Sequence, residues 1–170
     1  GDIVGNCHKI PNTRFDKNLL RESEVIESFG EFHSALVRFN PRAKIILTLS
    51  PVRHLRDTLE LNSVSKAVLR SAIHSIRTNF AGVEYFPAYE IMMDELRDSR
   101  FYRRDMIHPT TQAEDYIWEK FSEYCFDADT RAFIKESASV SAALNQRPFH
   151  PRAASHQEFL KQTLRRLQAL

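Results

Sequence analysis

Asp105 and His108 lie three residues apart in the segment Asp105-Met106-Ile107-His108, directly before Pro109. A carboxylate that orients an imidazole is the acid/base half of a Ser-His-Asp arrangement. The spacing alone is weak evidence, because Asp-x-x-His occurs by chance in many chains. The alternative interpretation is an Asp at a helix entrance beside a surface His. The position of the other polar residues in the fold must therefore decide between the two.

The composition is that of a single soluble globular domain. The chain has 170 residues, of which 42% are hydrophobic and 27% are charged, and this length is sufficient to bury a core. The net charge of +2 is too small to predict binding to nucleic acid. No apolar run approaches the roughly 18 residues of a membrane span. No signal peptide is visible, which favours the cytoplasm, although the abrupt start at Gly1 suggests that the N-terminus is missing.

Hydrophobic periodicity predicts alternating helices and strands. Apolar residues recur at helical spacing over residues 25–36 and 64–80, and Asn40-Pro41 and Gly82 are expected to end these helices. The run 44–49 is almost wholly apolar, as in a strand buried on both faces of a parallel sheet. Residues 83–86 form the next predicted strand. A further helix is expected from Thr111, with Glu114 in the capping-box position.

This order predicts an α/β fold, in which a parallel sheet carries helices on its faces. The tail differs in composition. Residues 137–156 are rich in Ala, Ser, Pro and Asn and are expected to form a loop or a loosely packed connection. Leu160, Leu164 and Leu167 then share one face of an amphipathic helix, which is expected to dock on the domain or on a second copy.

Four polar segments follow the predicted strands. Residues 50–54 end the first strand, 87–90 follow the second, 105–108 precede a helix, and 5–9 follow a short apolar segment at residues 3–4. Ligands of open α/β sheets bind beyond the carboxyl ends of the strands. We therefore expect these segments to meet at one edge and to form an active site.

The same segments resemble a known family. The bacterial GSCFA family, named for a Gly-Ser-Cys-Phe-Ala motif, is similar at five places: residues 5–9, 50–54, 62–67, 89–95 and 100–109. The resemblance covers about residues 3–126 and does not extend to the tail. It suggests a division into residues 1–126, the C-terminal part of a hydrolase domain, and residues 127–170, a helical tail.

This family is related to the SGNH (GDSL-like) hydrolases, and the relation implies a fold and a mechanism. The expected fold is flavodoxin-like, with three layers (α/β/α), of which this chain would hold a part. The expected activity is that of an esterase without a cofactor. His108 would be the general base and then the general acid, and Asp105 would orient it. Asn6 would donate a hydrogen bond in the oxyanion hole, although Gly5-Asn6 lacks the intervening residue of the usual Gly-x-Asn motif.

The family's nucleophile belongs to the Gly-Ser-Cys-Phe-Ala motif, and these 170 residues contain no such motif. The chain is therefore expected to be a fragment that cannot run the serine mechanism alone. Ser50 is the best internal substitute, but it lacks the Gly-x-Ser-x-Gly elbow. A Cys7-His8 dyad is disfavoured, because neighbours in an extended segment point to opposite sides.

Other residues at this edge are candidates for substrate binding. Arg53 could grip an anionic group, or it could form a structural ion pair with Glu90 or Asp94. His54, Tyr89 and Glu90 could line the pocket, as could Ser50. The expected substrate is a small ester or an acylated carbohydrate.

Two alternatives remain open. His8, His54, Asp105 and His108 could supply metal ligands, but no His-x-His or His-Glu-x-x-His spacing supports a metal site, and none is predicted. The stronger alternative is a non-catalytic module that forms a homo-oligomer to cover an incomplete sheet.

Overall fold

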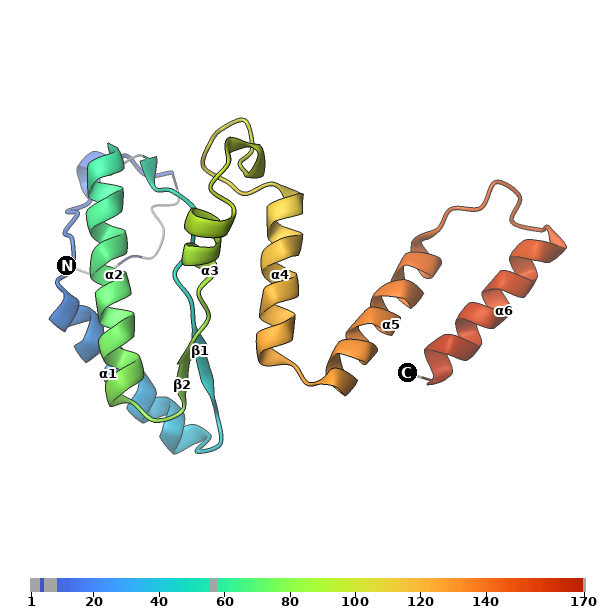
Figure 1. The fold of residues 1–170 in the computed structure, drawn as a ribbon, viewed down its shortest axis with the longest axis horizontal. Helices are drawn as coiled ribbons and strands as arrows, with labels where there is room; N and C mark the ends of the chain where they lie inside the picture. Colours follow the sequence, from blue (N-terminus) through green and yellow to red (C-terminus); the bar gives the residue numbers. More distant parts are fainter. Residues whose placement is uncertain (1–3, 5–8, 56–57, 170) are drawn as a thin grey trace. The chain divides into compact units, whose positions relative to one another are not determined.

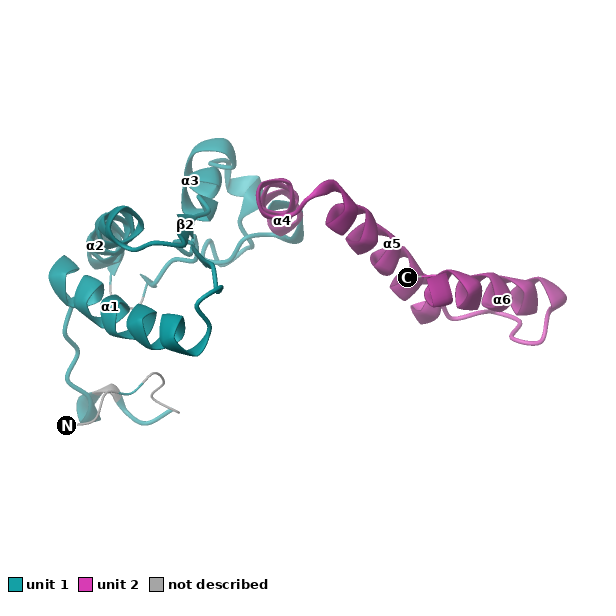
Figure 2. Ribbon diagram, turned by 90° about the horizontal axis from the view of Figure 1, so that it is seen from below, with its two compact units in different colours: residues 1–113 teal, residues 114–170 magenta. Residues whose placement is uncertain are grey.

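The computed structural model describes residues 4, 9–55 and 58–169. The chain divides into two units, residues 1–113 (unit 1) and residues 114–170 (unit 2), which Figure 2 distinguishes by colour. Unit 1 contains both strands of the described residues. Unit 2 contains most of helix α4 together with α5 and α6.

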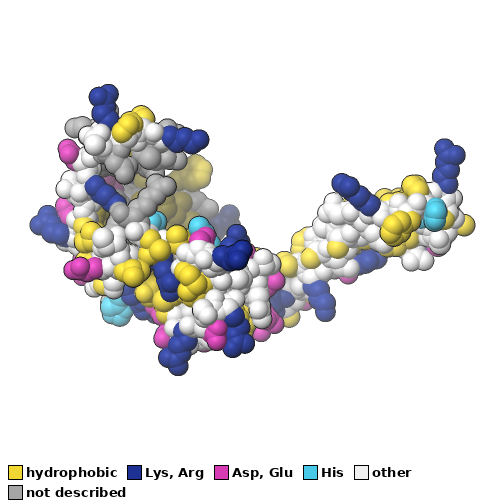
Figure 3. Space-filling view, turned by 90° about the horizontal axis from the view of Figure 1, so that it is seen from above, with side chains coloured by type: hydrophobic (Ala, Val, Ile, Leu, Met, Phe, Trp, Pro, Cys, Tyr) yellow, Lys and Arg dark blue, Asp and Glu magenta, His cyan; other side chains and the backbone are white. Residues whose placement is uncertain are grey.

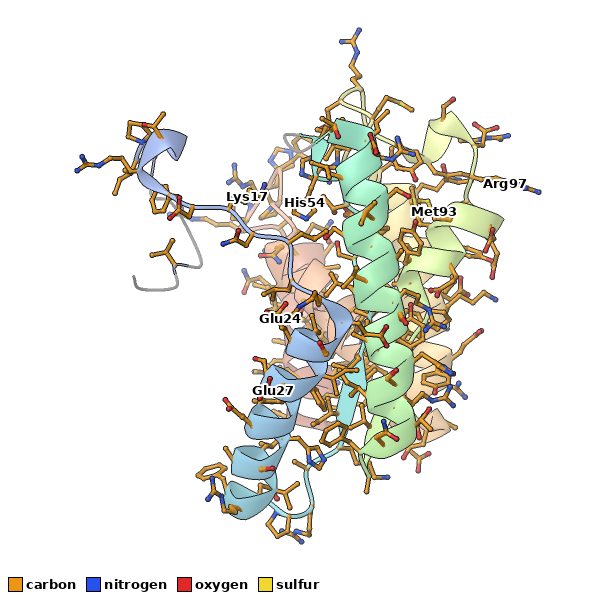
Figure 4. The ribbon with its side chains drawn as sticks, turned by 90° about the vertical axis from the view of Figure 1, so that its left-hand side faces the viewer. Lys17, Glu24, Glu27, His54, Met93 and Arg97 are labelled. Carbon is orange, nitrogen blue, oxygen red and sulfur yellow. The ribbon has the colours of Figure 1, made fainter. Side chains whose placement is uncertain are left out.

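Unit 1 is built around a strand–helix–strand unit. Its main elements are α1 (Glu22–Phe39), β1 (Ile45–Leu47), α2 (Thr58–Asn79) and β2 (Val83–Tyr85). Short turns complete it: η1 (Asn12–Arg14), α3 (Ala88–Glu90), the π-helical η3 (Ile91–Glu95) and η4 (Ser99–Phe101). Figure 4 shows α1 and α2 side by side. The two helices and the two parallel strands predicted for this region are confirmed, and the predicted α/β class requires such a parallel pair.

The two strands are parallel, with Ile45 opposite Val83 and Leu47 opposite Tyr85. One face of the pair is covered, because Leu47 and Tyr85 pack with Ile73 of α2. The other face is not. Side chains alternate along a strand, and Ile46 stands on the opposite face with 44% of its surface exposed. The prediction that this strand is buried on both faces is therefore wrong, because helices of unit 1 cover only one of them.

Helices α1 and α2 are held together by aromatic and polar contacts. Phe29 of α1 meets the Phe80 ring edge-on, with ring centroids 5.3 Å apart. At the start of α1, the Glu22 carboxylate accepts hydrogen bonds from the Ser71 and Ser75 hydroxyls at 2.8 and 2.9 Å. These contacts fix α1 along α2.

Unit 2 is helical among the residues described. Helix α4 spans Thr111–Cys125, α5 spans Ala128–Asn145 and α6 spans Ala154–Ala169. The predicted helix start at Thr111 is confirmed. The prediction of a loop from residue 137 is wrong, since α5 continues to Asn145. Alanine is the strongest helix former, and the first helix-breaking proline is Pro148, three residues beyond the end of the helix.

Within unit 2, α6 packs against α5, and docking of its leucine face on the domain or on a second copy stays a prediction. Thr163 is buried and the Arg166 guanidinium donates to the Glu136 carboxylate of α5 at 2.7 Å. The three leucines at 160, 164 and 167 remain 40–54% exposed. Figure 3 shows hydrophobic side chains at the surface of both units. Over the described ranges, no helix has the length and apolar character needed to cross a membrane.

The turn before β2 generates a stability prediction. Gly82 has φ +75°, and its carbonyl accepts from the Ile45 amide at 2.8 Å. A left-handed conformation costs a residue with a Cβ about 1–2 kcal/mol. We expect Gly82→Ala to lower the free energy of unfolding by about this amount, and Gly82→Asn by less, because Asn tolerates this region.

Urea denaturation measures both variants, with Gly30→Ala as the control. Gly30 lies inside α1, where a Cβ would come 3.3 Å from the Phe80 ring. Alanine favours the helix by roughly 0.5–1 kcal/mol, which offsets a small shift of that ring. Wild-type stability in Gly82→Ala would contradict the argument.

Candidate active site

The candidate site is a tight loop between η4 and α4. Tyr102 and Pro109 pair as an isolated antiparallel bridge at its base. Inside the bridge, the Arg103 amide donates to the His108 carbonyl at 2.8 Å, and the Met106 amide donates to the Arg103 carbonyl at 2.8 Å. In Figure 1 both strands run upward, and this loop lies at the top of the same unit. The carboxyl ends of the strands thus face the side on which the loop lies.

The Asp105 carboxylate organises the loop. Its Oδ1 accepts hydrogen bonds from the backbone amides of Ile107 and His108 at 2.9 and 3.1 Å. Its Oδ2 lies 2.7 Å from Nδ1 of the His108 ring. One carboxylate therefore fixes both the backbone and the imidazole of His108, which is the orienting contact that the spacing predicted.

These contacts determine the charge of Asp105 and the tautomer of His108. The hydrogen bond from His108, followed by those from the two amides, lowers the pKa of Asp105 to about 2. The carboxylate is therefore ionised at neutral pH and can only accept hydrogen bonds. In the neutral ring of His108, Nδ1 must carry the proton, which leaves Nε2 with its lone pair. The His108 side chain is 53% exposed, so this nitrogen can act as a general base.

Arg53 joins the segment after β1 to this loop. Its Nη1 donates to the Met106 carbonyl at 3.0 Å, and its guanidinium lies 4.3 Å above the centre of the Tyr102 ring. Met106 has φ +57°, a conformation that costs a residue other than Gly about 1–2 kcal/mol. The expected meeting of residues 50–54 with 105–108 is confirmed. The ion pair considered for Arg53, with Glu90 or Asp94, is not formed.

Helix α2 holds the segment 50–54 in place. The Lys66 ammonium, with only 6% of the residue exposed, donates to the Ser50 carbonyl at 2.5 Å. The His54 amide donates to Oδ1 of Asn62 at 2.9 Å. The Ser50 hydroxyl accepts from the Val52 amide at 3.3 Å. His54 is exposed near the N-terminal end of α2 (Figure 4).

The two candidates on α3 have other partners. The Glu90 carboxylate accepts from Arg70 Nε and from the Tyr85 hydroxyl, both at 2.6 Å. Burial opposes its charge, but these hydrogen bonds outweigh burial and lower the pKa of Glu90. Tyr89 packs, half-buried, against the core around Leu49. No hydrogen bond between described residues links either side chain to the 105–108 loop.

Some predicted residues lie outside the described ranges. These residues are Asn6, which is the expected oxyanion-hole donor, Cys7 and His8. Where the structure does describe the chain, no group of three or more His, Cys, Asp or Glu side chains could hold a metal ion. A cavity of about 500 Å³ lies between residues 17–20 and α2, with Leu19, Leu20, Leu61 and Leu69 in its wall. None of the predicted site residues lines it.

Three residues of the site were not predicted as such: Tyr102, Asn62 and Lys66. Asn62 and Lys66 are four residues apart and share a helical face with Ile73. A lysine on an otherwise core-facing stripe is the signal that could have identified Lys66. Tyr102 gives no comparable signal, because its role depends on a guanidinium 49 positions earlier in the sequence.

The pKa of Asp105 generates a prediction about pH. Since the folded value of about 2 lies below the ordinary 3.8, ionised Asp105 stabilises the loop above about pH 4. This contribution is lost as the pH falls through about 2. A carbon-detected NMR titration of the carboxyl group should find its midpoint near 2. His108→Ala should raise that midpoint, because it removes the hydrogen bond that contributes most to the lowered pKa of Asp105.

Asp127 provides the internal control for that titration. Its pKa is lowered by hydrogen bonds from Thr130, which His108→Ala leaves intact, so its midpoint should not change. A wild-type Asp105 midpoint near 4 would show that the hydrogen bonds to this carboxylate do not form in solution.

Comparison with known proteins identifies the family of this chain. No curated protein and no solved structure matches it. The model of the GSCFA family matches residues 1–121. The model of the GSCFA domain protein C-terminal domain matches residues 138–170, so the prediction that the resemblance stops before the tail was wrong. The chain belongs to the GSCFA family.

Proposed function

We propose that the Asp105–His108 pair is the acid/base half of a serine acyl hydrolase of the SGNH type. The observation that carries this proposal is the 2.7 Å contact between Asp105 Oδ2 and His108 Nδ1. It leaves Nε2 of an exposed imidazole available to accept a proton.

The proposed reaction has two steps. Nε2 of His108 takes the proton of a serine hydroxyl as its oxygen attacks the ester carbonyl, and Asp105 stabilises the resulting imidazolium. The imidazolium then protonates the leaving alkoxide, which completes formation of the acyl-enzyme. In the second step, Nε2 takes a proton from water as the water attacks the acyl group, and the imidazolium then protonates the departing serine oxygen. Among the described residues no serine hydroxyl is hydrogen-bonded to His108. The proposal therefore assigns the nucleophile to the Gly-Ser-Cys-Phe-Ala motif, which these 170 residues lack.

The proposal includes a fold and roles for the other candidates. The parallel β1–α2–β2 unit, with the loop on the side of its carboxyl ends, supports a partial flavodoxin-like fold with three layers. Asn6 is proposed to donate in the oxyanion hole. Ser50, His54, Tyr89 and Glu90 are proposed to contribute to binding a small ester or an acylated carbohydrate, with no cofactor. Arg53, a further binding candidate, contacts the loop of the acid/base pair through the Met106 carbonyl.

One observation favours a second candidate function. Ile46 is 44% exposed on the open face of the sheet, as expected for a non-catalytic module that self-associates to cover that face. Light scattering tests this alternative directly. A monomer at low micromolar concentration would contradict it.

Esterase turnover tests the main proposal. In the natural protein that contains this sequence, His108→Ala should lower kcat for an aryl acetate by about 10²- to 10⁴-fold, the range of general acid–base catalysis. Asp105→Asn should cause a smaller loss, because the superfamily does not always need this carboxylate. His74→Ala, which removes an exposed histidine of α2, is the matched control for non-specific hydrolysis by imidazole.

A fluorophosphonate probe should locate the nucleophile. The probe labels an activated serine, and mass spectrometry identifies the labelled peptide. Labelling that disappears in His108→Ala supports the proposal, and labelling of Ser50 would move the nucleophile into this chain. Turnover that is the same in His108→Ala and His74→Ala would refute the proposed role of the pair.

A further inference from the structure

Arg53 contacts the 105–108 loop at two separate points. Its Nη1 donates to the Met106 carbonyl at the tip of the loop, at 3.0 Å. The flat face of its guanidinium covers the Tyr102 ring at the base, 4.3 Å from the ring centre. Tyr102 is itself buried, with 7% of its surface exposed. The same side chain thus contacts both the base and the tip of the loop that carries Asp105 and His108.

The tip of the loop needs such a restraint. Met106 lies between Asp105 and His108 and has a left-handed backbone, with φ +57°. Strained residues persist only where the surrounding contacts hold them. The Asp105 carboxylate can accept from the amides of both Ile107 and His108 only while this turn keeps its shape. A hydrogen bond from a charged donor to the Met106 carbonyl favours that shape.

Arg53 is in turn held by α2. Two contacts flank it: Lys66 donates to the Ser50 carbonyl, and Asn62 accepts from the His54 amide. Lys66 is buried and Asn62 lies one helical turn before it. The backbone on either side of Arg53 is therefore fixed to a long helix, so the guanidinium reaches the loop from a rigid position.

We propose that Arg53 is a positioning residue, which fixes the Asp105–His108 geometry by holding Met106 and Tyr102. Its importance for turnover rests on the proposed hydrolase function, whereas its effect on the loop does not. Arg53 is also a candidate anchor for an anionic group of the substrate. Positioning and substrate binding make different demands on the guanidinium, and kinetics can separate them.

The first test needs no enzymatic activity. The Asp105 carboxyl is titrated by carbon-detected NMR in wild type, Arg53→Met and Arg104→Met. Arg104 is an exposed arginine of the same loop, so its variant measures the effect of removing one nearby positive charge. The Arg53→Met midpoint should rise from about 2 toward 3.8, well beyond the rise in Arg104→Met. Equal midpoints in the two variants would overturn the proposal.

The variant Arg53→Lys controls for the possibility that Arg53→Met changes the titration only because the protein unfolds. Lysine can donate to the Met106 carbonyl but cannot lie flat on the Tyr102 ring in the same way. Its midpoint should fall between those of wild type and Arg53→Met. An Arg53→Lys protein that unfolds cooperatively like wild type but titrates like Arg53→Met would show that the ring contact alone matters. A fully wild-type midpoint in Arg53→Lys would show that any cation suffices and would contradict positioning by the planar group.

The second test uses turnover of an aryl acetate by the natural protein. Small displacements of catalytic groups can cost about 100-fold, so Arg53→Met should lower kcat by roughly 10- to 100-fold and leave KM nearly unchanged. A rise in KM with an unchanged kcat would overturn positioning and indicate substrate binding. If wild type has no esterase activity, the hydrolase proposal fails, and the titration still decides the role of Arg53.

Discussion

The Asp105 carboxylate is the group on which the candidate site depends. It accepts three N–H groups, from the His108 ring and from two successive backbone amides. Each of these bonds favours the ionised carboxylate, so the pKa of Asp105 falls to about 2. A negative charge beside Nδ1 then selects the tautomer that leaves Nε2 basic. The shape of the loop, the charge of Asp105 and the tautomer of the neutral His108 ring thus all depend on one carboxylate and the turn that encloses it.

That turn is not stable by local sequence alone. Met106 adopts a conformation typical of glycine, and its carbonyl is met by Arg53 from a segment that precedes it by 53 positions. Part of the energy that keeps the turn closed therefore comes from the β1–α2 connection. Since Lys66 and Asn62 fix this connection to α2, the helix that forms the core with β2 also supports the loop of Asp105 and His108.

Local patterns predicted much of unit 1 but little of how the site is held. The 3.6-residue period located α1 and α2, because α2 buries one stripe of residues and α1 carries a half-buried one. The apolar run 44–49 identified a strand, yet composition does not report which faces are covered, and Ile46 is exposed. In α5, the serine and alanine content predicted a loop, yet alanine favours helix and α5 continues to Asn145. The Asp105–His108 contact followed from a spacing of three, whereas the partners of Arg53 depend on tertiary structure.

Lys66 shows how the site constrains the core. It lies on the face of α2 that reaches Ile73, where an apolar side chain would be the simplest choice for stability. Burial lowers the pKa of its ammonium, which shows that the environment opposes the charge. The ammonium is tolerated because it donates to the Ser50 carbonyl and so satisfies a backbone acceptor just beyond β1. The buried charge lowers the stability of the fold but fixes the path of residues 50–54. That path determines where Arg53 contacts the loop.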